Sequence, residues 1–90
     1  MSNTWDETLL EFPCEFPIKA FGLAADGFPD RVLQIVRQRL AEDSAVAMQY
    51  RCSQGGKYTA VTITIEASSK AQLDAIYEDL TACPQVIMAL

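Results

Sequence analysis

The 90-residue sequence predicts one α+β domain in which strands and helices follow in the order β-α-β-β-α-β. Apolar and polar side chains alternate in short segments, which is the pattern of half-buried strands. In two longer segments the apolar side chains recur every three or four residues, which is the pattern of helices with one buried face. Half of the residues are hydrophobic and 21% are charged, as in ordinary globular proteins, and the length fits a single domain.

The first strand is expected over 16–21 and is followed by a loop over 22–28 that contains two glycines. Pro29 then opens the first helix, since a residue at the first helical position needs no N–H of its own. The apolar stripe of this helix consists of Val32, Ile35, Val36 and Leu40.

A β-hairpin is expected in the middle of the chain. Its strands, 45–53 and 61–66, are separated by Gln54-Gly55-Gly56-Lys57, where glycine can take the positive φ of a tight turn. The apolar side of the first of these strands consists of Val46, Met48, Tyr50 and Cys52.

The second helix is expected to begin at a capping box formed by Ser69 and Gln72. Cys83-Pro84 ends it, because proline cannot continue a helix, and residues 86–90 form the last expected strand. The buried stripe of this helix consists of Leu73, Ile76, Tyr77 and Leu80.

Because each helix has a single apolar stripe, both are expected to pack on the same face of a four-stranded antiparallel sheet. This arrangement is ferredoxin-like. Residues 15–90 form the domain, and residues 1–14 precede it as an N-terminal arm. The opposite face of the sheet is expected to be open to water or to a wet partner, with these side chains: Lys19, Phe21, Gln49, Arg51, Thr62, Thr64 and Glu66.

The net charge of −5 belongs to the N-terminal segment, because residues 1–17 hold four acids and no base. The rest of the chain carries 7 bases and 8 acids, which leaves −1. Nucleic acid is therefore not expected as a partner, and the strand over 61–66 offers no aromatic side chain for base stacking. No apolar run approaches the roughly 18 residues of a membrane span, and the acidic N-terminus is unlike a signal peptide.

The sequence has three cysteines, Cys14, Cys52 and Cys83, which are far apart and odd in number. They fit a reducing cytoplasm better than a disulfide framework, and Cys52 is expected to be a small core residue. None has the spacing of a zinc site. The sequence also has no histidine, the usual general base and the commonest metal ligand. We therefore expect no metal, no cofactor and no enzymatic activity.

A candidate ligand site lies in the loop between the first strand and the first helix. Its residues are Gly22, Asp26, Gly27 and Asp30. The free N–H groups at a helix start can receive a carboxylate, and rigid scaffolds often hold ligands on such loops. The alternative is a plain turn, with Phe28 packed as a plug.

A candidate partner-binding patch lies in the arm. Its residues are Trp5, Leu9, Leu10 and Phe12, which would be an apolar patch if the arm stays undocked. The alternative is that Leu10 and Phe12 pack over the domain and enlarge its thin core.

Three motifs together resemble the YbeD-like family of small bacterial proteins. They are Leu10-Glu11-Phe12-Pro13, then Ser53-x-Gly55-Gly56-x-Tyr58 with Val61, Ile63 and Ile65, and a closing Val86-x-Met88-x-Leu90. The resemblance covers the chain from Leu9 onward. It implies a ferredoxin-like fold similar to the ACT domains that sense amino acids in metabolic enzymes, and it implies no catalytic residues.

Two functions follow as expectations. The first is a regulatory module that binds a small metabolite in the manner of ACT domains, as a homodimer with the ligand held near the loop over 22–30. The second is a protein–protein interaction adaptor that uses the N-terminal arm or the open face of the sheet.

Overall fold

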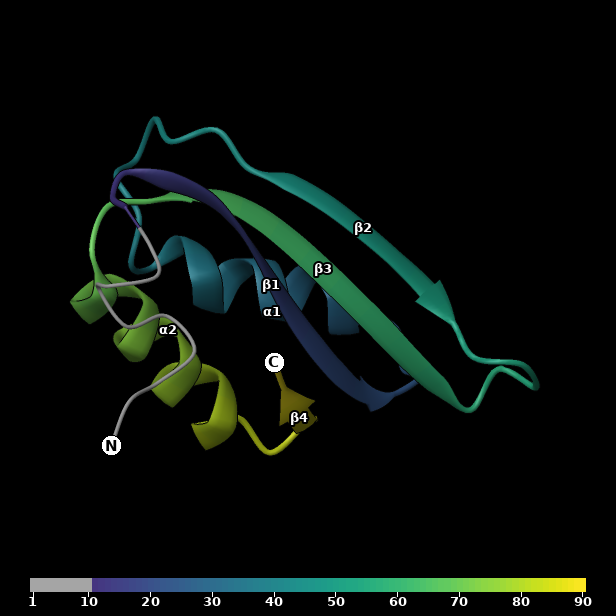
Figure 1. Cartoon of the computed structure of the whole chain (residues 1–90). Helices are drawn as coiled ribbons and strands as arrows, with labels where there is room; N and C mark the ends of the chain where they lie inside the picture. The colour runs from purple at the N-terminus through teal and green to yellow at the C-terminus, as the bar shows by residue number, and fades with distance from the viewer. Residues whose placement is uncertain (1–10) are drawn as a thin grey trace.

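The computed structural model describes residues 11–90 and confirms the predicted fold and element order (Figure 1). The elements are β1 (Cys14–Leu23), α1 (Phe28–Arg37), β2 (Ala47–Cys52), β3 (Tyr58–Ala67), α2 (Lys70–Ala82) and β4 (Val86–Ala89). Of the helices in residues 11–90, neither has the length and apolar run that crossing a bilayer requires.

The strands form one antiparallel sheet in the order β2-β3-β1-β4, so that the two long strands lie in the centre (Figure 1). β1 and β3 are paired from Cys14 opposite Ala67 to Leu23 opposite Tyr58. β1 is therefore longer than the expected strand over 16–21, because pairing with β3 holds residues extended on both sides of the alternating segment.

Both helices cover the same face of the sheet, and the core lies between them and the central strands (Figure 1). The strand residues of the core alternate along the chain, as a sheet with one buried face requires. They are Ile18, Ala20, Val61, Ile63, Ile65 and Ala67. The helices and their ends supply Phe28, Val32, Ile35, Val36, Leu73, Ile76, Leu80 and Cys83.

Phe28, the first residue of α1, fills the space beside Gly22 of β1. Its side chain is fully buried, and a Cβ atom on Gly22 would lie 2.6 Å from its ring and closer still to the carbonyl oxygen of Gln85. The expectation that Gly22 belongs to the loop is wrong, because it is paired with Thr59 in the sheet. Only a residue without a side chain lets the first turn of α1 pack this tightly on β1.

Two polar contacts join the segment after α1 to α2. The guanidinium of Arg39 donates to both carboxylate oxygens of Asp79, at 2.7 and 3.1 Å. Gln72 donates from its side-chain amide to the carbonyl oxygen of Arg39 at 3.0 Å. The Ser69 hydroxyl accepts the N–H of Gln72, as the capping box predicts, but the Gln72 side chain accepts the N–H of Ser68 instead of that of Ser69.

The expectation that Cys52 is a core residue is wrong, because the structure leaves it exposed. The helices pack mainly over β3 and β4, so the end of β2 extends beyond their cover. Met48 is half-buried, but Tyr50 is 59% exposed, and Cys52 lies still further along the strand. The alternation correctly predicted which side chains of β2 point to the helix side of the sheet. The helices do not cover the end of β2, so the side chains there are exposed.

Candidate functional site

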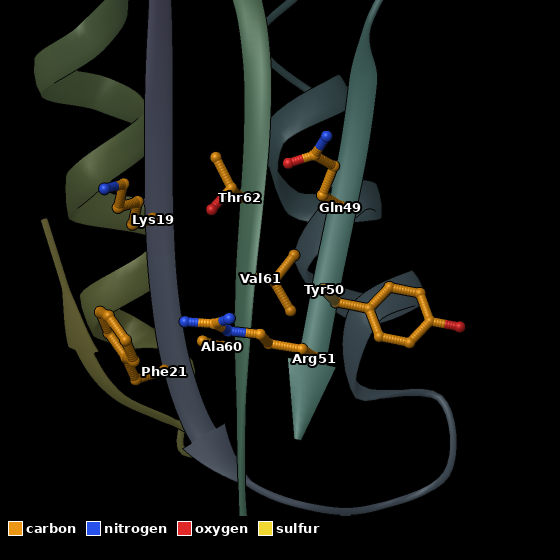
Figure 2. Close-up of a pocket in the computed structure, with 8 residues that line it drawn as sticks. All are labelled: Lys19, Phe21, Gln49, Tyr50, Arg51, Ala60, Val61 and Thr62. Atoms are coloured by element: carbon orange, nitrogen blue, oxygen red, sulfur yellow. The ribbon is translucent and has the colours of Figure 1, made fainter. Parts of the chain in front are cut away.

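The uncovered face of the sheet carries a hollow of about 420 Å³, here called the sheet hollow (Figure 2). Its side chains come from β1, β3 and β2: Lys19, Phe21, Gln49, Arg51, Ala60 and Thr62. Tyr50 and Val61 also border it, but Val61 belongs to the core, and Figure 2 shows Tyr50 pointing away beyond β2.

The strand register arranges these six side chains in two rows. Residues that are directly paired in neighbouring antiparallel strands point to the same face of the sheet. The first row consists of Lys19, Thr62 and Gln49, and the second consists of Phe21, Ala60 and Arg51. Each row therefore crosses the three strands β1, β3 and β2 in turn.

Ala60 forms the floor of the sheet hollow. It lies on the central strand β3 between Phe21 and Arg51, and its side chain is a single methyl group. Figure 2 shows the Arg51 side chain extending over Ala60 toward β1. The hollow therefore exists because a small side chain is flanked by large ones, and a larger residue at this position would fill it.

The sheet hollow is positively charged in a protein of net charge −5. Lys19 and Arg51 line it, and no carboxylate does so among the described residues. The acids of this face lie at its other end, where Glu15 is directly paired with Glu66. Lys19 lies four positions after Glu15, which is about 13 Å along the extended strand β1.

Beside the hollow, the same face carries large exposed apolar side chains, here called the apolar rim. Met88 is paired with Phe21, and Leu23 with Tyr58, while Leu90 exchanges backbone hydrogen bonds with Lys19. The rim consists of Leu23, Tyr58, Met88 and Leu90, which are 55, 41, 51 and 58% exposed. The Lys57 ammonium group lies 5.5 Å from the centre of the Tyr58 ring. Lys57 is therefore a third cation near this surface, besides Lys19 and Arg51 of the sheet hollow.

The residues predicted to form a loop site do not come together around one cavity. Gly22 is buried in β1 beneath Phe28, whereas Asp26, Gly27 and Asp30 are exposed at the start of α1. Gly27 has a φ of 83° and caps the helix with its backbone, since its carbonyl oxygen accepts the N–H of Arg31 at 2.8 Å. Phe28 is buried, in agreement with the alternative of a packed turn.

The predicted partner-binding patch of the arm is only partly within the described residues. Phe12 is half-buried and packs against the core, as its alternative expects. Trp5, Leu9 and Leu10 lie outside the described residues.

Sequence reasoning identified the polar side chains of the sheet hollow but missed its floor and its rim. Ala60 carries no chemistry of its own, and its importance comes from its neighbours across the sheet. The sequence predicts Met88 in the last strand and Leu23 in the loop over 22–28. The structure extends β1 to Leu23 and pairs Met88 with Phe21, which puts both residues beside Phe21. The sequence did contain one sign of the hollow: in the alternation over 58–67, Ala60 is a small residue at a position that points to the uncovered face.

The groups with clearly shifted pKa values lie away from the sheet hollow. The hydrogen bonds from Arg39 lower the pKa of Asp79, and those to Asp79 raise the pKa of Arg39. Burial raises the pKa of Tyr77, on α2, to about 12. These shifts accompany contacts that join elements of the fold, so they give no reason to expect proton transfer there.

The interior of the described part offers no polar group waiting for a ligand. Within residues 11–90, every buried side-chain nitrogen and oxygen has a hydrogen-bond partner. The same residues contain no group of three or more side chains able to hold a metal ion.

Comparison with known proteins places these features in a family. Residues 7–90 match the family described as "Protein of unknown function (DUF493)". The chain is 44% identical to a UPF0250 protein of Paraburkholderia phytofirmans, over 94% of this chain and 96% of the relative. It is 40% identical to a UPF0250 protein of Nitrosomonas europaea, over 94% and 98% of the two chains.

A solved structure supports the fold. The solution structure of protein HP0495 from H. pylori matches with a TM-score of 0.72, over 90% of this chain and 85% of that chain. At 12% identity this likeness concerns the fold alone. The family match spans nearly the whole sequence and confirms the resemblance carried by the three motifs. The chain belongs to the YbeD-like DUF493/UPF0250 family, which has members in many bacteria.

Proposed function

We propose that this protein is a non-catalytic binding module, and that it binds another protein through the uncovered face of its sheet. One observation carries the proposal: the sheet hollow and the apolar rim form a continuous surface on the side that the helices leave bare. Large apolar side chains gathered on a surface commonly mark a protein-binding site.

The chemistry of this surface favours binding over catalysis. The sheet hollow offers two cations, an amide, a hydroxyl and an aromatic ring, but no pair of nucleophile and base. The sequence contains no histidine that could act as the base. Cys14, Cys52 and Cys83 are free thiols, which supports the cytoplasm as the place where the module works.

The test is face-specific photo-crosslinking in living cells of a bacterium that contains a family member. A photoreactive phenylalanine replaces Thr62 on the uncovered face or, as the control, Gln34 on the exposed side of α1. We expect discrete protein adducts from position 62 that are absent or much weaker from position 34. Adducts that are equal at both positions, or that form only at position 34, would contradict the proposal.

A second candidate is a regulatory module that binds a small metabolite in the manner of ACT domains. The observation that favours it is the cationic hollow itself, whose volume of about 420 Å³ is that of a small-molecule site. The hollow is open, whereas small-molecule sites bury most of their ligand, and for this reason we rank the protein partner first.

Thermal denaturation in the presence of amino acids, short carboxylic acids and nucleotides tests the metabolite candidate. A ligand at 100 times its Kd stabilises by about 2.7 kcal/mol, which raises Tm by roughly 10 °C or more in so small a domain. Ala60→Ile should abolish a shift caused by binding in the hollow, and Asp26→Ala should abolish one caused by binding in the loop. Gly27→Val is a poor probe, because a β-branched residue is strained at the φ of 83°.

The homodimer is proposed to form along the edge of β2. Ser53 donates its backbone N–H to the carbonyl oxygen of Tyr58 at 2.7 Å. Because hydrogen-bonded pairs alternate along an antiparallel ladder, Met48, Tyr50 and Cys52 turn their N–H and C=O groups away from the sheet. A second copy could pair with these groups about a two-fold axis.

Proline at position 50 tests this dimer without removing a hydrogen bond inside the protomer, since the N–H of Tyr50 points outward. We expect Tyr50→Pro to be a folded monomer by light scattering, while the control Tyr50→Thr stays dimeric. Wild-type protein that remains monomeric at high concentration would refute pairing along β2.

A further inference from the structure

We propose that the sheet hollow receives a carboxylate side chain from an acidic segment of the partner protein, and that Phe21 and Met88 contact an apolar residue next to that acid. This inference rests on the proposed function and names the chemistry of the partner. Three features carry it: the positions of the two cations, the small floor beside Arg51, and the apolar pair next to that floor.

The two cations can converge on one group. Lys19 and Arg51 lie on β1 and β2, on either side of the central strand β3. Strands are about 4.8 Å apart and the two residues are one row apart along the strands, so their Cα atoms are separated by roughly 12 Å. Figure 2 shows Arg51 extending over Ala60 and Lys19 turned to the other side of β1, so a change of rotamer at Lys19 would bring the two cations to one group. Ala60 lies beside Arg51 in the same row, one row away from Lys19 and Thr62, and its small side chain leaves the space that an incoming carboxylate needs.

Arg51 is suited to hold the carboxylate, because its planar guanidinium can donate two parallel hydrogen bonds to the two oxygens. Thr62 adds a hydroxyl donor one row away, beside Lys19. Figure 2 shows the end of the Arg51 side chain over Ala60 and not directed into solvent beyond β2. The site is thus arranged for an anion that arrives from above the sheet.

The apolar contact is directly beside this position. Phe21 shares the row of Ala60 and Arg51, and Met88 is its neighbour on β4. In an extended segment, side chains on the same side are about 6.8 Å apart. An acid over Ala60 and an apolar residue two positions away therefore fit the hollow and the apolar pair together.

Charge favours an acidic protein segment over nucleic acid. Nucleic acid also meets cations and aromatic rings, but its charge is continuous along the strand. The uncovered face is positive only near the hollow, and a longer polyanion along β1 and β3 would reach Glu15 and Glu66. A short segment with one or two acids gains the attraction of Lys19 and Arg51 without that repulsion.

Peptide display tests the proposal with a library of random 12-residue peptides selected on the full chain. We expect enriched peptides to carry Asp or Glu within two positions of a large apolar residue. Their affinity should fall at least tenfold on Arg51→Glu and on Ala60→Ile, and should stay within twofold on Arg37→Glu. Arg37 is the matched control, since it is an exposed arginine on α1 that undergoes the same change of charge.

NMR titration of the wild-type protein with an enriched peptide separates the failure of this inference from the failure of the proposed function. Chemical-shift changes at the hollow and the rim, caused by a peptide that needs its acid to bind, support both the inference and the proposed function. Shifts there with peptides that lack an acid overturn the inference and leave the proposed function standing. Peptides that bind only elsewhere contradict both.

Two further probes use the same protein. Acetate or glutarate that reaches the affinity of the peptide would assign the hollow to a small acid and overturn the protein segment. A 12-nucleotide single-stranded RNA that binds the same face more tightly than the peptide would overturn it in favour of nucleic acid. We expect neither probe to bind with the affinity of the selected peptides.

Discussion

The two faces of the sheet are made by the same strands and differ in almost every other respect. On β3, Val61, Ile63 and Ile65 are buried against the helices, while the alternate positions Ala60 and Thr62 border the sheet hollow. The covered face is closely packed, so each of its side chains is constrained by its neighbours. The uncovered face carries charge, a cavity and exposed apolar groups that the fold does not need for its core, and this freedom makes it the place to look for function.

The largest effect is expected on the covered face, at Phe28. Truncation of this fully buried ring by Phe28→Ala should cost about 3–5 kcal/mol of unfolding free energy. Urea denaturation measures it, and a loss under 1 kcal/mol would show that Phe28 is not part of the core. Gly22→Ala should also destabilise. Phe28→Leu should reduce this cost only in part, because it removes the clash with the ring but leaves the one with the backbone carbonyl oxygen of Gln85.

The next effect compares the same substitution on the two faces. Ala20→Ile places a large side chain on the covered face, where Ala20 is fully buried, and should cost about 1–3 kcal/mol. Ala60→Ile places it on the uncovered face, where we expect a change within about 0.5 kcal/mol and a loss of peptide binding. Equal destabilisation by the two variants would mean that the faces do not differ as described.

A smaller effect concerns Tyr77, on α2, whose hydroxyl donates to the carbonyl oxygen of Leu90 at 2.5 Å. Below pH 10, Tyr77→Phe should cost about 0.5–1.5 kcal/mol for this hydrogen bond. The pKa of Tyr77 is raised from 10.0 to about 12, so its contribution is complete below pH 10 and is lost as the pH rises toward 12. The stability difference between wild type and Tyr77→Phe should therefore shrink over that range; a constant difference would contradict the assignment.

The smallest effect is at the acidic end of the uncovered face. Glu66→Lys replaces a repulsion with an attraction to Glu15 directly across the strands, and should stabilise by about 0.2–1 kcal/mol. The gain should decrease at high salt. Glu42→Lys makes the same change of charge in a loop and serves as the control. If both variants change stability equally, the effect comes from net charge and not from the pair.

Sequence reasoning predicted most of the fold because the local patterns agree with the tertiary structure. Alternation over 61–66, the stripe from Val32 to Val36 and the serine cap of α2 each correspond to an observed element. Leu40 is expected in the stripe of the first helix but lies beyond its end at Arg37. The errors at Gly22 and Cys52 have another origin, because the environments of these residues depend on residues distant in the sequence. Gly22 is in a strand because Phe28 and β3 surround it, and Cys52 is exposed because the helices do not reach the end of β2.

The candidate site was only half predictable for a related reason. The polar side chains of the uncovered face follow from alternation alone, since every second residue of a half-buried strand faces outward. Their grouping into rows requires the register between strands that lie far apart along the chain: Lys19 and Thr62, which share a row, are 43 residues apart. The register depends on the packing of the whole sheet. For this reason no local motif in the sequence predicts the hollow.

The two ends of the uncovered face carry opposite charges, and this affects how a partner approaches the protein. Lys19 and Arg51 at one end, and Glu15 and Glu66 at the other, give this surface an electric polarity along β1 and β3. An approaching chain with unevenly distributed charge would be turned by that field before contact, so only one of its two directions along the strands leads to productive encounters. The association rate constant would then depend steeply on ionic strength while the dissociation rate constant changes little, and the polarity of the surface would select the direction of the bound chain as well as its composition.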